Sequence, residues 1–408
     1  MDAVSRLGGG MQGLRVEEES VAAPGESVIF TEHEGAEGYA GAEWPGARME
    51  EDFARITKEA LEALESEEGV TVTRSCASSE SGSLMSRGIS LYGAAGVSER
   101  WLTGHTKGVW RILPLSPEKV LSCSYDKTAK VWDLYSQKCT HTLKRHPGEV
   151  LCAETLGDYL LTGCGKGILN IWDKTDFSHV GQIKDPKEQG FYSLLRLSPD
   201  RVASGTCQKP NGHKGPWEHD IKIWNIALNQ LVGTCKGHKG GIPKMVKLED
   251  TYIVSCSADE TIRIWDTATQ ECKGERRAHK AYIYSMCALG DMIMTGGRDR
   301  EIHAWDKETL EPLGSFVSGH QGYAHGSTIY DLCAVSKHVF ASASRDGVVK
   351  LWDIRTKKVI KALDADDGFI YSVCATTGDS VVAGTAGRVP LDPKQKAVPS
   401  LAYWKFRE

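Results

Sequence analysis

A tryptophan that recurs along the chain constrains the fold of this 408-residue protein more than any other feature. Consecutive copies lie between 40 residues (Trp132 to Trp172) and 52 residues (Trp172 to Trp224) apart, and five of the seven are followed directly by aspartate. Each is preceded by alternating residues, as in AKVWD, IRIWD and VKLWD. The seven are Trp132, Trp172, Trp224, Trp265, Trp305, Trp352 and Trp404. This period and alternation predict seven units of four short strands each.

Most copies share further polar residues upstream of the tryptophan. In the regular copies a histidine precedes it by 26 or 27 residues, as His146 precedes Trp172. Four copies add a serine or threonine and an aspartate. We assign these sets as His105, Ser122, Asp126 and Trp132; His238, Ser255, Asp259 and Trp265; His279, Thr295, Asp299 and Trp305; and His320, Ser342, Asp346 and Trp352. The second copy has Lys166 in place of the aspartate, and the third and seventh depart further and carry insertions.

With seven phased copies, the chain resembles the WD-repeat (WD40) β-propeller family. The resemblance implies an all-β fold, a seven-bladed propeller over residues 98–408. It also implies that residues 98–104 pair with residues 401–406 to close the ring, and that each His–Ser/Thr–Asp–Trp set is a structural hydrogen-bond network. Because an enzyme needs one assembled site and these sets recur in four copies, we expect no catalytic residues and no enzyme activity.

Residues 1–97 have a different composition. They hold 18 acidic and 7 basic residues, a net charge of −11, whereas residues 98–408 hold 42 basic and 36 acidic residues, a net charge of +6. Richness in Gly, Ala, Glu and Ser predicts a mostly disordered acidic extension. One segment, 49–65, places Met49, Phe53 and Ile56 on one face and predicts a short helix.

The cysteines and the apolar runs bear on compartment and cofactors. Twelve cysteines occur without any C-x-x-C pair, which favours buried free thiols over a metal site. The chain begins without an apolar signal-like region and contains no apolar run long enough for a membrane span. We therefore expect a cytoplasmic or nuclear protein with no metal and no cofactor.

Aromatic residues recur at one place in the repeat, directly after the first core residue of each copy. Alternation along a strand sends this second residue to the opposite side from the core, and the resemblance implies that it lines the narrow end of the propeller. Neighbouring turn residues add further aromatics and arginines. The predicted partner-binding residues are Trp110, Tyr125, Tyr192, Tyr282, Tyr284, Arg298, Tyr330, Arg345, Phe369 and Tyr371. Such a composition is typical of interface hot spots, so we predict a non-enzymatic scaffold that binds a peptide or protein partner.

Two alternative functions stay open. Residues 352–355 form a W-D-x-R box ending in Arg355, which resembles the adaptor-binding box of WD-repeat substrate receptors in cullin–RING ubiquitin ligases. The other alternative is an RNA- or ribosome-associated WD-repeat factor. A net charge of +6 over residues 98–408 is low for a nucleic-acid-binding domain, so a protein is the favoured partner.

Overall fold

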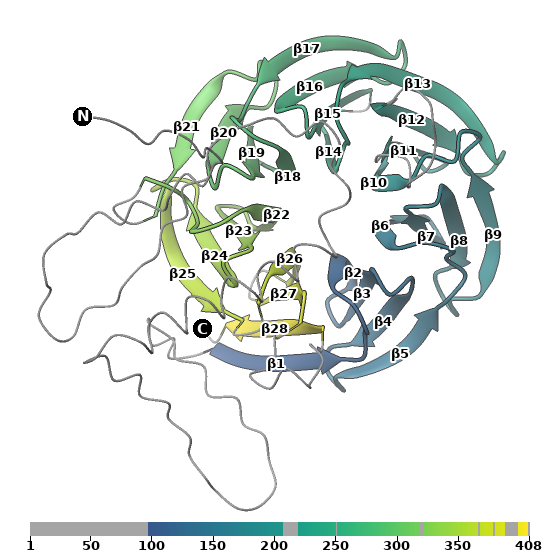
Figure 1. Ribbon diagram of the computed structural model, residues 1–408, viewed down its shortest axis with the longest axis horizontal. Helices are drawn as coiled ribbons and strands as arrows, with labels where there is room; N and C mark the ends of the chain where they lie inside the picture. Colours follow the sequence, from purple (N-terminus) through teal and green to yellow (C-terminus); the bar gives the residue numbers. More distant parts are fainter. Residues whose placement is uncertain are drawn as a thin grey trace, which may run out of the picture. The chain divides into compact units, whose positions relative to one another are not determined.

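Seven four-stranded antiparallel sheets stand around a common centre in the computed structural model (Figure 1). The structure describes residues 97–406, apart from 207–218, 250, 319–321, 366–367, 378–379 and 388–398. The predicted disorder of the acidic extension and the predicted helix at 49–65 lie outside these residues. In the part of the chain that the structure describes, no helix has the length and apolar character needed to cross a membrane.

Each blade takes its strands from the centre outward in chain order. Blade 1 comprises β2 (Val109–Ser116), β3 (Lys119–Ser124), β4 (Ala129–Asp133) and β5 (Lys138–Leu143). Blade 2 comprises β6 (Val150–Leu156), β7 (Tyr159–Cys164), β8 (Ile168–Asp173) and β9 (His179–Lys184). Blade 3 comprises β10 (Phe191–Arg196), β11 (Arg201–Thr206), β12 (His219–Asn225) and β13 (Gln230–His238). Blade 4 comprises β14 (Lys244–Lys247), β15 (Tyr252–Cys256), β16 (Thr261–Asp266) and β17 (Glu271–Arg277).

The remaining blades follow the same order. Blade 5 comprises β18 (Ile283–Leu289), β19 (Met292–Gly297), β20 (Ile302–Asp306) and β21 (Pro312–Phe316). Blade 6 comprises β22 (Ile329–Ser336), β23 (Val339–Ser344), β24 (Val348–Asp353) and β25 (Lys358–Asp364). Blade 7 comprises β26 (Ile370–Thr377), β27 (Ser380–Thr385) and β28 (Ser400–Phe406), with β1 (Val97–Thr103) as its outermost strand.

The pairing of β1 with β28 closes the ring and confirms the predicted closure. The register runs antiparallel from Val97 opposite Phe406 to Thr103 opposite Ser400. The two ends of the repeat region therefore meet in one sheet (Figure 1). Because the blades form a closed ring, each one packs between two neighbours, which cover both of its faces and leave only short sheet edges.

The recurring tryptophan seals each blade against the one before it. Trp172 of blade 2 packs with Leu121 and Val131 of blade 1 in one apolar cluster. The pattern repeats around the ring to Trp132 of blade 1, which packs with Val382 of blade 7. One tryptophan per repeat thus takes part in each interface between blades, and its burial there explains why every copy contains it.

The inner strands carry a β-bulge that bears on function. Six of the seven change register at the second residue of the copy, for example between Val109 and Arg111 and between Ile329 and Asp331. The first residue stays in the core, where Val109 and Ile329 are fully buried. A bulge leaves its extra residue out of the ladder and re-aims the side chain. The bulged residues are Trp110, Leu151, Tyr192, Tyr284, Tyr330 and Tyr371.

Candidate functional site

Six aromatic side chains meet at the end of the central channel. We call Trp110, Tyr125, Tyr192, Tyr284, Tyr330 and Tyr371 the aromatic layer. Trp110 of blade 1 stacks on Tyr192 of blade 3 with ring centroids 6.0 Å apart, and lies 5.5 Å from Tyr371 of blade 7. Its ring also contacts Tyr330 of blade 6 at 6.2 Å. Because Trp110 contacts aromatic side chains of blade 3 and of blades 6 and 7, the layer spans the channel mouth.

The remaining members extend the same contact network. Tyr125 packs on Trp110 at 5.5 Å and meets Tyr371 edge-on. Tyr284 contacts Tyr330, which in turn contacts Tyr371 at 5.1 Å. The six residues are half-buried, so each retains some exposed surface. These sequence-predicted aromatics therefore come together, and they pack against one another at the channel mouth.

Burial keeps the tyrosine hydroxyls of this layer protonated. It raises the pKa of Tyr330 to about 12 and raises the pKa values of Tyr125 and Tyr284 as well. The neighbouring Arg298 and Arg345 guanidiniums act in the opposite direction on Tyr330. Since neutral phenols both donate and accept hydrogen bonds, the layer offers apolar faces together with polar edges.

The other predicted binding residues lie beside blades 5, 6 and 7. Tyr282 is 42% exposed, and Arg298, the first residue of the turn between β19 and β20 in blade 5, is exposed as well. The guanidinium of Arg345 lies over the ring of Phe369, 4.8 Å from its centroid. We call these four residues the arginine rim. It adds positive charge on one side of the aromatic layer.

Beneath the aromatic layer lies a charged group that the sequence analysis did not anticipate. We call Arg111, Lys244, Ser285 and Asp331 the ionic layer. The carboxylate of Asp331 accepts hydrogen bonds from Lys244 Nζ at 2.8 Å, Ser285 Oγ at 2.9 Å and Arg111 Nη1 at 3.3 Å. Its second oxygen accepts from the backbone N–H of Val373 at 3.2 Å. One carboxylate of blade 6 thus joins blades 1, 4, 5 and 7.

The electrostatics of Asp331 follow from this set of partners. Burial would raise its pKa, but the Lys244 and Arg111 cations hold the pKa below its usual value. A cavity of about 20 Å³, room for about one water molecule, lies between the two layers and is lined by Trp110, Tyr192, Asp331 and their neighbours. The sequence held a signal for this layer at the third position of the copies. Arg111, Lys244 and Asp331 are charged there, whereas the other four copies have Ser or Cys.

The polar sets of the regular copies form continuous hydrogen-bond chains. In blade 1, Trp132 Nε1 donates to Ser122 Oγ at 2.7 Å, and Ser122 lies 2.6 Å from His105 Nε2. His105 Nδ1 lies 2.7 Å from Asp126 Oδ2. Because a carboxylate only accepts, Nδ1 carries the proton and the serine hydroxyl donates to Nε2. Blades 4 and 5 have the same chain through His238 and His279.

The sixth copy requires a correction. The histidine that completes its chain is His325, with Nδ1 2.9 Å from Asp346 and Nε2 2.6 Å from Ser342. The assignment of His320 to this set was wrong, and His320 itself lies outside the described residues. The sequence held the signal, since His325 precedes Trp352 by the same 27 residues that separate His105 from Trp132. The insertion comes before this histidine.

Blades 2 and 3 show what replaces an incomplete chain. In blade 2, His146 still bonds Thr162 at 2.7 Å, but without an aspartate its buried Nδ1 has no hydrogen-bond partner among the described residues. Burial lowers the pKa of His146 to about 4. In blade 3, a buried ion pair between Lys222 and Asp185 occupies the corresponding region. The Trp–Ser bond persists there, from Trp224 to Ser204 at 2.8 Å.

Arg355 of the W-D-x-R box lies at the opposite end of the repeat unit, in the turn after β24. Its guanidinium donates to both carboxylate oxygens of Asp353, at 2.6 and 3.2 Å, and its side chain is 65% exposed. An exposed arginine remains available to a partner, although its charge is already paired. Adaptor binding through Arg355 stays a prediction.

Comparison with known proteins places the repeats in a family. The family model described as WD domain, G-beta repeat, matches residues 96–133, 137–173, 229–266, 270–306 and 311–353. Each segment begins with the outermost strand of one blade and ends with the tryptophan strand of the next, which belongs to blade 1, 2, 4, 5 or 6. The third and seventh copies, which carry insertions and lack the regular polar set, fall outside the matched segments.

Individual relatives have diverse roles. The chain is 25% identical over 318 residues to the rice ribosome biogenesis protein WDR12 homolog, covering 66% of this chain and 70% of the relative. It is 26% identical over 163 residues to rice pre-mRNA-processing factor 19, covering 38% of this chain and 29% of that protein. It is 22% identical over 324 residues to the human kinesin-like protein KIF21B, covering 71% of this chain and 19% of that protein. The chain thus spans less than a third of the last two relatives.

Proposed function

Because this chain belongs to the WD-repeat family, we propose that it is a non-enzymatic scaffold that binds a peptide or protein partner at the mouth of its channel. The aromatic layer and the arginine rim together form the proposed contact surface. The observation that carries the proposal is the meeting of six aromatic rings from five blades, four of them around Trp110.

The chemistry of this surface suits a partner segment more than a small molecule. The cavity behind the rings is too small for a ligand larger than about one water molecule, so a partner must lie over the rings. Rigid aromatic side chains lose little conformational entropy on binding and dominate interface energetics. Arg298 and Arg345 on one side favour a segment that presents a carboxylate there.

The test is affinity purification with the full chain and two variants of the surface, Tyr284→Ala and Tyr371→Ala. We expect each variant to lose the partners that the native chain retains, because each removes one ring of the contact surface. Tyr135→Ala is the matched control, since Tyr135 is 85% exposed in the turn between β4 and β5 and belongs to neither layer. An identical partner set for all four proteins would refute the proposal, provided that circular dichroism shows them folded.

A second candidate, association with RNA or ribosomes, is favoured by the names of two relatives. One is a ribosome biogenesis protein and another a pre-mRNA-processing factor. If the protein associates with RNA or ribosomes in this way, the nucleus fits better than the cytoplasm, the other expected compartment. Treatment with ribonuclease during the same purification separates the candidates: partners held through RNA disappear, whereas partners held by the aromatic layer remain. RNA binding by the purified chain that weakens steeply with salt would support the second candidate.

A further inference from the structure

Four blades have a complete His–Ser/Thr–Asp–Trp network, and blade 5 differs from the other three at two positions. The second and fourth residues after the network aspartate are Thr128 and Lys130 in blade 1, and Thr261 and Arg263 in blade 4. Blade 6 has Val348 and Lys350 at these places, whereas blade 5 has Glu301 and His303. Blade 5 therefore has a histidine where the other three blades have a lysine or arginine, and it has a second carboxylate.

The charges make the difference explicit. Blades 1 and 6 place one cation beside the aspartate in the repeat, Lys130 with Asp126 and Lys350 with Asp346, and Arg263 takes this place in blade 4, where it also pairs with Glu275 at 3.1 Å. In blade 5, Asp299 and Glu301 carry two negative charges when His303 is neutral. Such an excess of negative charge in a largely buried place is costly unless a cation balances it.

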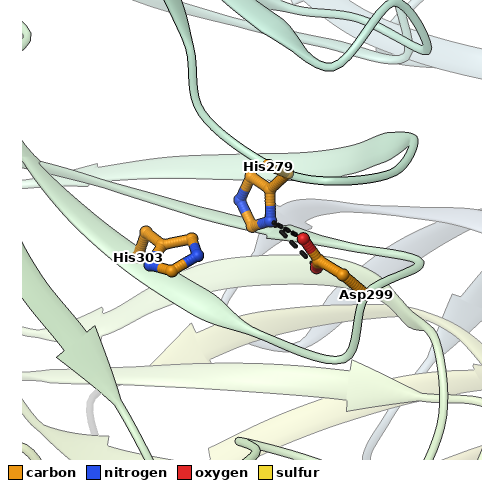
Figure 2. A group of neighbouring side chains, drawn as sticks. All are labelled: His279, Asp299 and His303. Atoms are coloured by element: carbon orange, nitrogen blue, oxygen red, sulfur yellow. Dashed lines mark hydrogen bonds and ion pairs between the residues drawn. The ribbon is translucent and has the colours of Figure 1, made fainter.

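The side chains of blade 5 also gather in the geometry of a metal-ligand set. The ligand atoms of His279, Asp299 and His303 lie within 4.8 Å of one another, and Figure 2 shows the His303 ring beside the hydrogen-bonded pair of His279 and Asp299. Glu301 Oε2 lies 2.9 Å from His303 Nε2, and His303 Nδ1 lies 2.8 Å from Ser315 Oγ. Nδ1 is therefore held by Ser315, and Nε2, beside the Glu301 carboxylate, is the nitrogen that an ion would take. The side chains of Asp299, Glu301 and His303 are 9%, 24% and 21% exposed, so an ion can reach them from solvent.

From this arrangement we infer that blade 5 binds a divalent transition-metal ion, of which Zn²⁺ is the probe, through Asp299, Glu301 and His303. One imidazole and two carboxylates suit zinc, with water completing four-coordination. Zinc bonds of about 2.0–2.2 Å place ligand atoms roughly 3–4 Å apart, so the Glu301 and His303 side chains must turn toward Asp299 when the ion binds.

His279 takes the role of a positioning residue. Both of its ring nitrogens are occupied, Nδ1 by the Asp299 oxygens at 2.9 Å and Nε2 by Thr295 at 2.7 Å. The backbone N–H of Lys280 also donates to Asp299 at 3.1 Å. These bonds orient the carboxylate, as the outer partners of metal ligands do in known sites.

The other blades supply the matched variant. The double change Glu301→Thr and His303→Lys gives blade 5 the residues of blade 1, a combination that the same fold already accommodates. Zinc binding is measured by isothermal titration calorimetry on the full chain. All proteins carry Cys139→Ser and Cys272→Ser, because these two thiols are exposed and bind zinc themselves.

The native residues should bind one more zinc ion per chain than the double variant, and His303→Lys alone should weaken that site at least tenfold. A gain-of-function experiment completes the test, in which Thr128→Glu and Lys130→His install the blade 5 residues in blade 1. This chain should bind one ion more than native. Equal stoichiometry for native, double-variant and blade 1 proteins would overturn the inference and assign Glu301 and His303 to a simple ion pair.

Discussion

The hydrogen-bond chains of the blades and the ionic layer at the channel centre stabilise the same ring of blades in different ways. Each His–Ser/Thr–Asp–Trp chain lies within one blade, and the chain recurs in four blades, so that none is unique. At the centre, one carboxylate, that of Asp331, joins five blades, and no repeat duplicates it among the described residues.

This difference teaches how a repeat protein divides its stability. Redundant local networks can lose a member, as blade 2 has lost its aspartate to Lys166 and blade 3 has exchanged its network for an ion pair. A unique central contact cannot be replaced by a neighbour. Four substitutions test the comparison.

The largest effect is expected for Asp331→Asn. The change leaves the Arg111 and Lys244 cations in the channel without a carboxylate, and removing one partner from a buried ionic network costs about 3–5 kcal/mol. The free energy of unfolding of the full chain, measured by urea titration, should fall by that amount. Asp291→Asn is the control, because Asp291 is 92% exposed and should leave stability unchanged. Equal values for both variants would remove the central role given to Asp331.

A smaller loss is expected for Asp126→Ala. This change removes the acceptor of His105 Nδ1, of the Thr106 N–H and of the Thr128 hydroxyl, but it leaves the Trp132–Ser122–His105 part in place. Leaving buried donors unsatisfied costs about 1–3 kcal/mol. The same urea titration measures it, with the exposed Asp158→Ala as control. A loss of unfolding free energy as large as that of Asp331→Asn would contradict the proposed redundancy of the His–Ser/Thr–Asp–Trp chains.

Blade 2 offers a gain of stability. Lys166→Asp restores the carboxylate for His146 Nδ1 and should add about 1 kcal/mol at pH 7. Burial lowers the pKa of His146 to about 4. In the unfolded chain His146 has the ordinary histidine pKa of about 6.5. As pH falls from this value towards 4, His146 binds a proton in the unfolded chain but not in the folded chain, so the native protein loses stability over this range.

The new carboxylate should raise the pKa of His146 in the folded state and reduce that acid loss. Unfolding at pH 7 and pH 5 measures both effects, and Lys166→Ala separates the removal of lysine from the addition of the acid. If Asp and Ala at position 166 behave alike, blade 2 does not need the fourth member of the chain.

The smallest effect is expected for Arg355→Ala. It breaks only the pair with Asp353 within an exposed turn, so the urea midpoint should stay unchanged. The variant therefore tests the ligase-receptor alternative without a folding effect: a native chain that captures the cullin–RING adaptor and a variant that does not would support it. Failure of the native chain to bind the adaptor removes that alternative.

The sequence also anticipated parts of the channel mouth. The recurrence of aromatics after the first core residue identified Trp110 and four tyrosines, because the bulge repeats in the inner strands as regularly as the residues do. It did not identify Tyr330 as a neighbour of Trp110, because that contact depends on the diameter of the closed ring. The choice of His320 was wrong because the insertion was placed after the histidine, whereas the 27-residue spacing to Trp352 selects His325.

By itself, the sequence determined the number of blades and the tryptophans that seal them, because every copy buries a tryptophan and pairs its strands in the same way. The strand that closes the ring followed from the family resemblance. Only the tertiary structure decided that Arg111 meets Asp331, 220 positions along the chain, and that Glu301 and His303 stand beside the chain of blade 5. Such contacts occur once, so no repetition predicts them, and the contact between Arg111 and Asp331 arises only when the blades are packed in a closed ring.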